Sequence, residues 1–183
     1  MRFNLLDRIT EVHPGRSLRA VKNLTLAEEY LADHFPSFPV LPGVLMLQGL
    51  VEAGSWLLRL TEDYRHSVIV LRDVKNIKYG SFVEPGRQLS FQVELSERGD
   101  GVATFKGKGW IDPVDVDPPS REGQSAVSAR LVLATYNLRD RISALASNDE
   151  RIVRQLREQA GLLCHLPGGA SAGAAAARER GAP

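Results

Sequence analysis

The sequence predicts an α+β fold in which an antiparallel sheet of six strands curves around one long central helix. Residues 44 to about 64 form an uninterrupted helical pattern that is apolar on most of its faces, which is typical of a buried helix. Four strand-like runs follow this helix, and two shorter ones precede it. One buried helix combined with consecutive antiparallel strands favours a curved sheet wrapped around that helix.

Each strand is indicated by β-branched and aromatic residues between turn signals. The first two strands are expected at residues 3–12 and 18–24, around a turn at His13-Pro14-Gly15. The remaining four are expected at residues 67–77, 88–95, 102–111 and 126–136. Gly99-Asp100-Gly101 is a hairpin signal between two of them. Residues 112–124 are polar and proline-rich, so a longer loop is expected there.

The chain divides into one fold-bearing domain and two additions. Residues 1–140 contain the six strands and the central helix. In residues 141–166, the capping residues Ser147 to Glu150 precede apolar residues spaced four apart, which predicts a short amphipathic helix. Residues 167–183 are rich in alanine and glycine, which bury too little surface to offset chain ordering, so we expect a disordered tail.

Composition excludes several classes of protein. The chain has 183 residues, 43% hydrophobic and 25% charged, which is ordinary for one globular domain. Its net charge of +1 argues against a nucleic-acid-binding protein. Cys164 is the only cysteine, which excludes an internal disulfide and a multi-cysteine metal site.

No targeting or membrane segment is expected either. The most apolar stretch, residues 41–60, contains one amide and two charged side chains, so it does not predict a membrane span. Residues 1–8 have too short an apolar run for a signal peptide. We therefore expect a cytoplasmic protein.

The densest chemical signal is the loop that leads into the central helix. His34 is followed by three prolines at a spacing of three: Pro36, Pro39 and Pro42. These prolines stiffen the loop and place His34 near the start of the helix. The first backbone N–H groups of the helix, around Gly43 and Val44, lack intrahelical partners and can polarise a carbonyl oxygen. His34 is a base that titrates near neutrality, although a structural loop histidine is the alternative.

Two polar residues lie inside the apolar helix. Gln48 and Glu52 are four residues apart and share one helix face. A carboxyl group in such a helix is a candidate for a raised pKa and for proton transfer, unless it is a satisfied buried group or faces an interface. Gln48 cannot exchange a proton at ordinary pH, but it can hydrogen-bond a substrate hydroxyl or orient a water.

These residues resemble a known family. The run H-F-P-x-x-P-x-x-P-G-V-L from His34 to Leu45 is similar to that of the (3R)-hydroxyacyl-[acyl-carrier-protein] dehydratases of fatty-acid synthesis, of the FabZ/FabA type. Residues 3–9 resemble the opening of the same family. A further family segment is matched at Asp73, Tyr79, Val83, Pro85, Gly86 and Leu89. The resemblance covers roughly residues 3 to 138.

The resemblance implies a hot-dog fold and a dimer, or a larger assembly of dimers, with acyl-thioester tunnels at the subunit interface. It implies dehydration of a 3-hydroxyacyl thioester carried by acyl-carrier protein or coenzyme A. In that reaction His34 takes the α-proton, and N–H groups at Gly43 and Val44 hold the thioester oxygen. A second group protonates the leaving hydroxide. No metal or organic cofactor is implied.

The sequence departs from the family at the second group. The family's catalytic acid position is occupied by Gln48, and the family's glutamine, one turn later, is Glu52. We therefore predict His34 and Glu52 as catalytic residues, and Gln48, Gly43 and Val44 as substrate-binding residues. Two other hypotheses stay open: a non-catalytic homologue that binds acyl thioesters or their carrier protein, and a hot-dog thioesterase that uses Glu52.

Overall fold

The computed structural model describes residues 4–113 and 123–164 and confirms the α+β class. The strands are β1 (Arg8–His13), β2 (Ser17–Asn23), β3 (Val68–Tyr79), β4 (Gln88–Gly99), β5 (Val102–Ile111) and β6 (Gln124–Tyr136). The long helices are α1 (Gly43–Thr61) and α2 (Ala146–Leu163), and short 3-10 turns are η1 (Glu29–Ala32), η2 (Leu138–Asp140) and η3 (Ser143–Leu145). Their order along the chain matches the sequence prediction.

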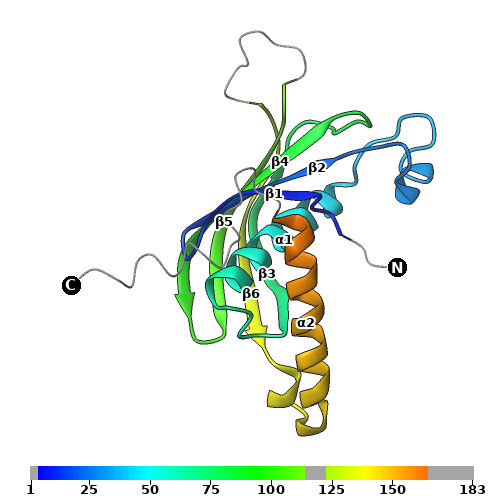
Figure 1. Ribbon diagram of the computed structural model, residues 1–183. Coiled ribbons are helices and arrows are strands. Elements are labelled where there is room, and N and C mark those ends of the chain that lie inside the picture. The colour runs from blue at the N-terminus through cyan, green and yellow to red at the C-terminus, as the bar shows by residue number, and fades with distance from the viewer. Residues whose placement is uncertain (1–3, 114–122, 165–183) are drawn as a thin grey trace.

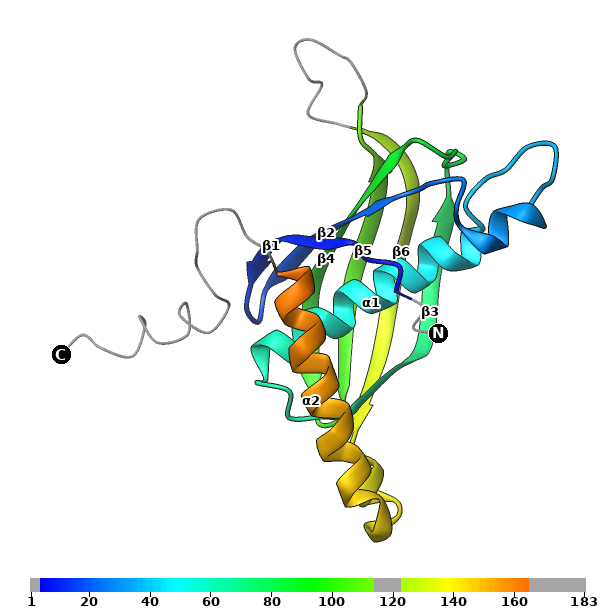
Figure 2. The same ribbon diagram turned by 45° about the vertical axis from the view of Figure 1, so that its right-hand side comes forward.

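The six strands form one antiparallel sheet in the order β1-β2-β4-β5-β6-β3. The sheet curves around α1, as Figures 1 and 2 show. Strands β3 and β1 are its two edges, and β3 is twice as long as β1, at 12 residues against 6. This arrangement is the predicted sheet around a central helix.

The core lies between α1 and the concave face of the sheet. Phe91 of β4 and Phe105 of β5 are fully buried there, together with Leu50 and Leu57 of α1. Gly49 allows α1 to come this close, because a Cβ atom at this position would lie 2.4 Å from Cζ of Phe91. The depth of the helix therefore depends on the absence of a side chain at residue 49.

Helix α1 ends three residues before the predicted end at Tyr64. The N–H of Glu62 still donates to the carbonyl of Leu58 at 2.9 Å, but Asp63 and Tyr64 have φ of 50° and 60°. Two successive left-handed residues cannot continue a right-handed helix. The apolar pattern could not reveal this stop, because Tyr64 is itself buried against the core.

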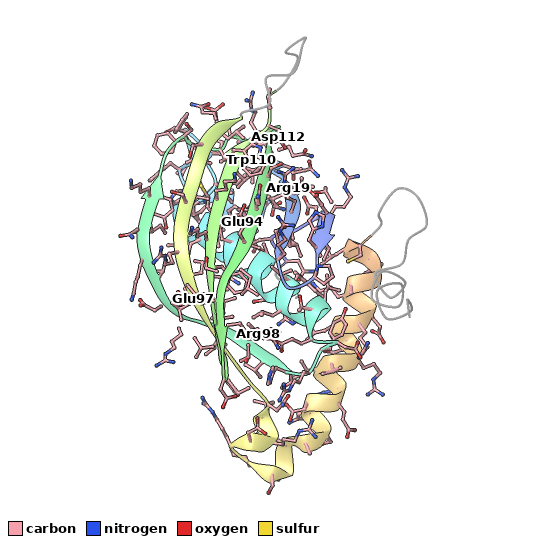
Figure 3. All side chains as sticks on the ribbon, turned by 90° about the vertical axis from the view of Figure 1, so that its left-hand side faces the viewer. Arg19, Glu94, Glu97, Arg98, Trp110 and Asp112 are labelled. Atoms are coloured by element: carbon pink, nitrogen blue, oxygen red, sulfur yellow. The ribbon has the colours of Figure 1, made fainter. Side chains whose placement is uncertain are left out.

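The C-terminal end of β4 is linked to the C-terminal end of α1 by an ion pair. Figure 3 shows Trp110 and Asp112 at one end of the sheet, and Glu97 and Arg98 at the other. Arg98 Nη2 lies 2.9 Å from Oε1 of Glu62, which directly follows α1. This ion pair links the β4 end to the helix terminus.

The N-terminal segment differs from the prediction of a strand from residue 3 onward. Strand β1 begins only at Arg8, and residues 4–6 cross over α1. Leu5 and Leu6 are each 2% exposed. Their burial against the helix, rather than pairing in the sheet, explains why an apolar pattern was mistaken for strand.

Helix α2 occupies the region in which the sequence predicts an amphipathic helix, but its predicted cap is wrong. Leu145 is the residue before the helix, and no side chain caps it. Asp149 instead points inward, 1% exposed, and accepts hydrogen bonds from the Ser67 hydroxyl and from the N–H groups of Leu138 at 2.9 Å and Arg139 at 3.0 Å. Asp149 thus anchors α2 to the domain.

The predicted tail at residues 167–183 lies outside the described residues, as does most of the predicted loop at 112–124. In the part of the chain that the structure describes, no helix is long and apolar enough to cross a membrane.

We predict that Gly49→Ala destabilises the protein by about 1–3 kcal/mol, because the new methyl group overpacks against Phe91. Urea denaturation measures the change in the free energy of unfolding. The same substitution at Gly161 of α2, which has open space around it, is the control and should stabilise by about 0.5–1 kcal/mol through helix propensity. A Gly49→Ala variant as stable as the wild type would contradict the close approach of α1 and β4.

Candidate active site

The imidazole ring of His34 is held in place by a hydrogen bond within the proline-rich loop. Its Nδ1 lies 3.1 Å from the carbonyl oxygen of Val40, and the N–H of Val40 donates back to the carbonyl of His34 at 3.2 Å. A carbonyl only accepts, so the neutral ring carries its proton on Nδ1 and its lone pair on Nε2. The half-buried imidazole is therefore oriented as a base through Nε2.

The start of α1 provides free N–H groups next to this loop. Pro42 precedes the helix, and no side chain caps it. Within the described residues, the N–H groups of Gly43 and Val44 donate no hydrogen bond, and Val44 is 68% exposed. A side chain at residue 43 would come within 3.0 Å of the Tyr79 ring, so glycine allows this ring to lie against the helix start. The arrangement suits a developing negative charge on a bound carbonyl oxygen.

The exchanged pair, Gln48 and Glu52, lies one turn apart on α1. Gln48 is exposed on the same helix face as Val44, and its side chain acts to lower the pKa of Glu52. Glu52 is half-buried beneath the N-terminal segment, and its Oε2 accepts the N–H of Leu5 at 3.0 Å. Burial raises the pKa of Glu52, although the N–H groups of Leu5 and Leu6 act in the opposite direction. The site thus contains a carboxyl group biased towards its neutral form.

The structure brings together four of the five predicted site residues along one helix: Gly43, Val44, Gln48 and Glu52. His34 lies in the loop that precedes this helix. It forms no hydrogen bond or ion pair with Gln48 or Glu52 among the described contacts.

Sequence reasoning missed two contributors to this site. Arg59, seven residues after Glu52, stacks on Trp56 with its guanidinium carbon 5.3 Å from the ring centroid. Burial lowers the pKa of Arg59 to about 10, and its Nε has no hydrogen-bond partner among the described residues. The spacing of seven was a usable signal, because it places Arg59 on the Glu52 face of the helix. The second contributor, the backbone N–H of Leu5, has no comparable signal in the sequence.

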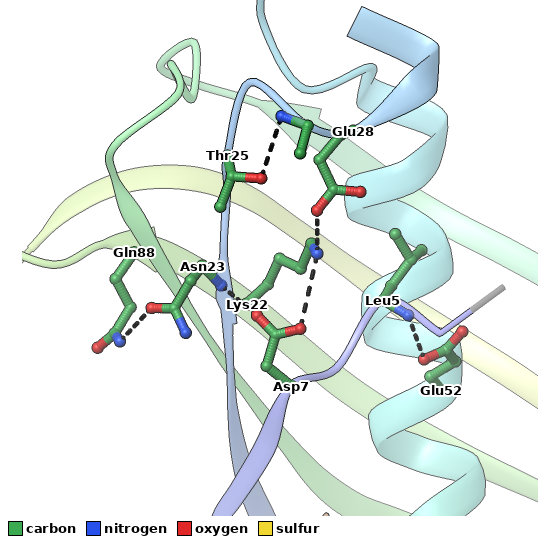
Figure 4. A network of polar contacts seen from close by, with 9 residues as sticks. Leu5, Asp7, Lys22, Asn23, Thr25, Glu28, Glu52 and Gln88 are labelled. Atoms are coloured by element: carbon green, nitrogen blue, oxygen red, sulfur yellow. Dashed lines mark hydrogen bonds and ion pairs between the residues drawn. The ribbon is translucent and has the colours of Figure 1, made fainter.

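A second polar network fixes the segments on either side of the site (Figure 4). Lys22 of β2 is 5% exposed and forms ion pairs with Asp7, at 3.6 Å, and with Glu28. Asp7 directly follows the segment that covers Glu52, and Glu28 directly precedes η1 in the connection to His34. A buried charge without such partners is strongly destabilising, so these acids hold Lys22 in place and are themselves held.

An apolar surface surrounds the helix start. Its members are exposed aromatic or aliphatic residues: Phe35 (52%), Phe38 (46%), Val44 (68%), Tyr79 (49%) and Phe82 (65%). Phe38 and Phe82 are in edge contact with ring centroids 5.8 Å apart. We call these five residues the apolar mouth. Patches of exposed apolar side chains mark interaction or ligand-binding surfaces.

Within residues 4–113 and 123–164, no group of three or more His, Cys, Asp or Glu side chains is placed to hold a metal ion.

Comparison with known proteins relates the chain to one family. The FabA-like domain family matches residues 1–116. The chain is 38% identical over 112 residues to the 3-hydroxyacyl-[acyl-carrier-protein] dehydratase FabZ of Bacillus subtilis (strain 168), covering 58% of this chain and 79% of that protein. It is 33% identical over 139 residues to the dehydratase of the same name from Dechloromonas aromatica (strain RCB), covering 74% and 90%.

Solved structures share the fold at low sequence identity. The dehydratase heterocomplex ApeI:P from Xenorhabdus doucetiae aligns with a TM-score of 0.59 at 15% identity, over 78% of this chain and 90% of that one. The smu.793 protein from Streptococcus mutans UA159, bound to acetyl CoA, aligns with a TM-score of 0.52 at 12% identity, over 74% and 92%. With the antiparallel sheet around α1 and the proline-spaced loop before it, the sequence match over more than half its length shows that this chain belongs to the FabA-like family of hot-dog proteins.

Proposed function

We propose that the chain is a hydro-lyase that converts 3-hydroxyacyl thioesters into trans-2-enoyl thioesters in fatty-acid or related lipid biosynthesis. The observation that carries the proposal is the His34–Val40 hydrogen bond, which leaves Nε2 as a base beside a helix start with free N–H groups. The named dehydratases among the relatives support the same chemistry.

In the proposed reaction, the thioester carbonyl oxygen accepts hydrogen bonds from the backbone N–H groups of Gly43 and Val44. This contact stabilises negative charge at the carbonyl oxygen and acidifies the neighbouring C2–H bond. His34 Nε2 takes the C2 proton, and the C2–C3 double bond forms as the C3–O bond breaks. Glu52 donates its proton to the departing hydroxide, which leaves as water. His34 and Glu52 then regain their starting protonation states by exchange with solvent.

Glu52 suits the acid role because burial raises its pKa and keeps a proton available. Gln48 lies between Glu52 and the exposed helix face, so we propose that its amide binds the substrate hydroxyl or a water that links the hydroxyl to Glu52. The named dehydratases among the relatives rank the thioesterase hypothesis lower.

A non-catalytic function is the second candidate. Gln48, which cannot donate a proton as an acid, occupies the exposed position on the helix face, while the carboxyl group of Glu52 is turned beneath residues 4–6. This geometry favours a protein that binds an acyl thioester without dehydrating it, if Glu52 fails to reach the substrate.

We propose that a second copy of the chain covers the apolar mouth and completes the substrate tunnel. The apolar mouth exposes five large side chains, and β3 is a long sheet edge whose own residues Val70 and Leu71 are exposed. Unpaired strand edges of this length readily pair with another chain. Edge pairing of β3 would bring two mouths into one assembly.

We propose acyl-carrier protein, rather than free coenzyme A, as the carrier of the substrate. On the face of the sheet away from α1, Lys106, Arg130 and Lys75 are direct cross-strand neighbours on β5, β6 and β3. Like charges in this arrangement repel each other. Lys75 forms an ion pair with Asp73 at 3.6 Å, and Glu94 of β4 lies opposite Lys106, whereas Arg130 forms no ion pair within the described residues. An acidic carrier surface would neutralise this row.

The first prediction concerns the acid. Glu52→Gln should lower the rate of hydration of a crotonyl thioester by about 10²–10⁴-fold, because in this direction Glu52 is the general base that takes a proton from the added water, the reverse of its acid role in dehydration. The glutamine oxygen can still accept the N–H of Leu5, so the fold should be retained. His34→Ala should lose activity to a similar extent, and Gln48→Glu should raise the rate.

Two outcomes would contradict this assignment. An unchanged rate in Glu52→Gln would make Glu52 a structural residue. A wild type without turnover on acyl-carrier-protein substrates, together with activity in Gln48→Glu, would establish the non-catalytic homologue instead.

The second prediction concerns the assembly. Phe82→Asp should weaken the dimer by at least about a hundredfold, since each copy loses the burial of a phenylalanine, about 1.5–3 kcal/mol. Sedimentation of the variant and the wild type at matched concentrations measures the change. Leu162→Asp is the matched control, because Leu162 is 78% exposed on α2, away from the apolar mouth. A monomeric wild type, or equal effects of both substitutions, would contradict the proposed interface.

A further inference from the structure

Helix α2 lies beyond the part of the chain that matches the FabA-like family, residues 1–116. Figures 1 and 2 show that it crosses the C-terminal half of α1, with its C-terminal end next to β1. Ala160 and Leu163 are buried in the common core, and Val153, Leu156 and Cys164 pack against it. The helix is therefore an integral cover of the domain.

Three contacts fix α2 along its length. At its start, Asp149 is anchored to the Ser67 hydroxyl and to two backbone N–H groups. In its second half, Arg157 forms an ion pair with Asp63 at 2.9 Å and lies over the Tyr64 ring at 4.5 Å. Burial alone would raise the pKa of Asp149, but its three hydrogen bonds hold this pKa below the ordinary value.

The third contact leads towards the candidate site. Gln159 Nε2 donates to Oδ1 of Asn4 at 2.8 Å, and the N–H of the next residue, Leu5, donates to Glu52 at 3.0 Å. From Asp7 onward the chain is held by the sheet, since the N–H of Asp7 donates to Val21 at 2.9 Å. Residues 4–6 have no strand pairing, so their position over Glu52 depends on α1 and α2.

We propose that α2 is a positioning element that holds residues 4–6 over Glu52 and so limits the access of water to this carboxyl group, with Gln159 as the positioning residue. The inference rests on the proposed function, in which Glu52 is the general acid. It assigns a role in the reaction to a helix outside the matched family domain.

Few charged groups lie close enough to Glu52 to affect its pKa. Among the described residues, Arg59 on α1 is the charged group that acts on the pKa of Glu52, and residues 4–6 present the N–H groups of Leu5 and Leu6 to it. On the α2 side, Arg157 and Cys164 lie next to Tyr64 rather than Glu52. Access of water to Glu52 is therefore the property that α2 controls.

A change in pH dependence follows from this arrangement. Burial is the largest influence on the pKa of Glu52 and raises it, whereas the N–H groups of Leu5 and Leu6 lower it. Loosening residues 4–6 removes both effects, so the pKa falls towards that of an exposed glutamate. Since the proposed reaction needs protonated Glu52, the loss of rate at high pH then begins at a lower pH.

The experiment compares full-length Gln159→Ala and Asp149→Asn with Gln155→Ala, an exposed α2 residue one turn earlier that forms no hydrogen bond within the described residues. For each variant, kcat and KM are measured over the pH range in which carboxyl and imidazole groups titrate. Hydrogen exchange at the N–H of Leu5 is measured in parallel. In both test variants, kcat for dehydration at high pH should fall about threefold or more, with KM unchanged and faster exchange at the N–H of Leu5. Gln155→Ala should match the wild type.

Unchanged pH profiles and unchanged exchange in both test variants, with Glu52→Gln inactive, would overturn the inference and leave the proposed function standing. Equal changes in Gln155→Ala would also overturn it. An active Glu52→Gln variant would instead overturn the proposed function, and the role of α2 in the reaction with it.

Discussion

The close approach of α1 to the sheet at Gly49 determines how the rest of the molecule is covered. Phe91 fills the space that a side chain at residue 49 would occupy, and a Cβ at Gly107 of β5 would lie 3.2 Å from Leu50. With one side of the helix held this closely, its opposite side faces away from the sheet and needs another cover. Residues 4–6 and α2 provide that cover. Both the N-terminal crossing and the C-terminal helix thus follow from the depth of α1.

The cover has an electrostatic consequence, because Glu52 and Arg59 lie on the covered side of the helix. Removing a charge from water is costly, and two isolated charges respond by shifting their pKa values towards the neutral forms. Burial raises the pKa of Glu52 and lowers that of Arg59 to about 10. The pair is too far along the helix to form a close ion pair, so Glu52 keeps the character of a weak acid. A polar interior therefore arises from the same packing that fixes the fold.

The sequence could predict most of this architecture, because strands and a buried helix differ in hydrophobic period. It could also locate His34, Gln48 and Glu52, since a proline-spaced loop and polar residues in an apolar helix are local signals. Features that depend on distant contacts were not predictable. Leu5 has the same apolar pattern as a strand residue, and Asp149 resembles a helix cap although its partners, such as Ser67, lie far away in sequence. The roles of the site residues in catalysis stay predictions.

The exchange of Gln48 and Glu52 connects acid strength to the integrity of the fold. At residue 48 a carboxyl group would be exposed, whereas at residue 52 it lies beneath residues 4–6. Because the folded state raises the pKa of Glu52, its contribution to stability is greatest below the ordinary glutamate pKa and is lost as pH rises through the raised value. Asp149 acts with the opposite sign: its lowered pKa gives stability above the ordinary aspartate pKa that is lost only as pH falls. The hydrogen bonds of Asp149 therefore stabilise α2 at the higher pH values at which Glu52 loses its own contribution to stability. Residues 4–6 and α2 thus stay in place over Glu52 at those pH values.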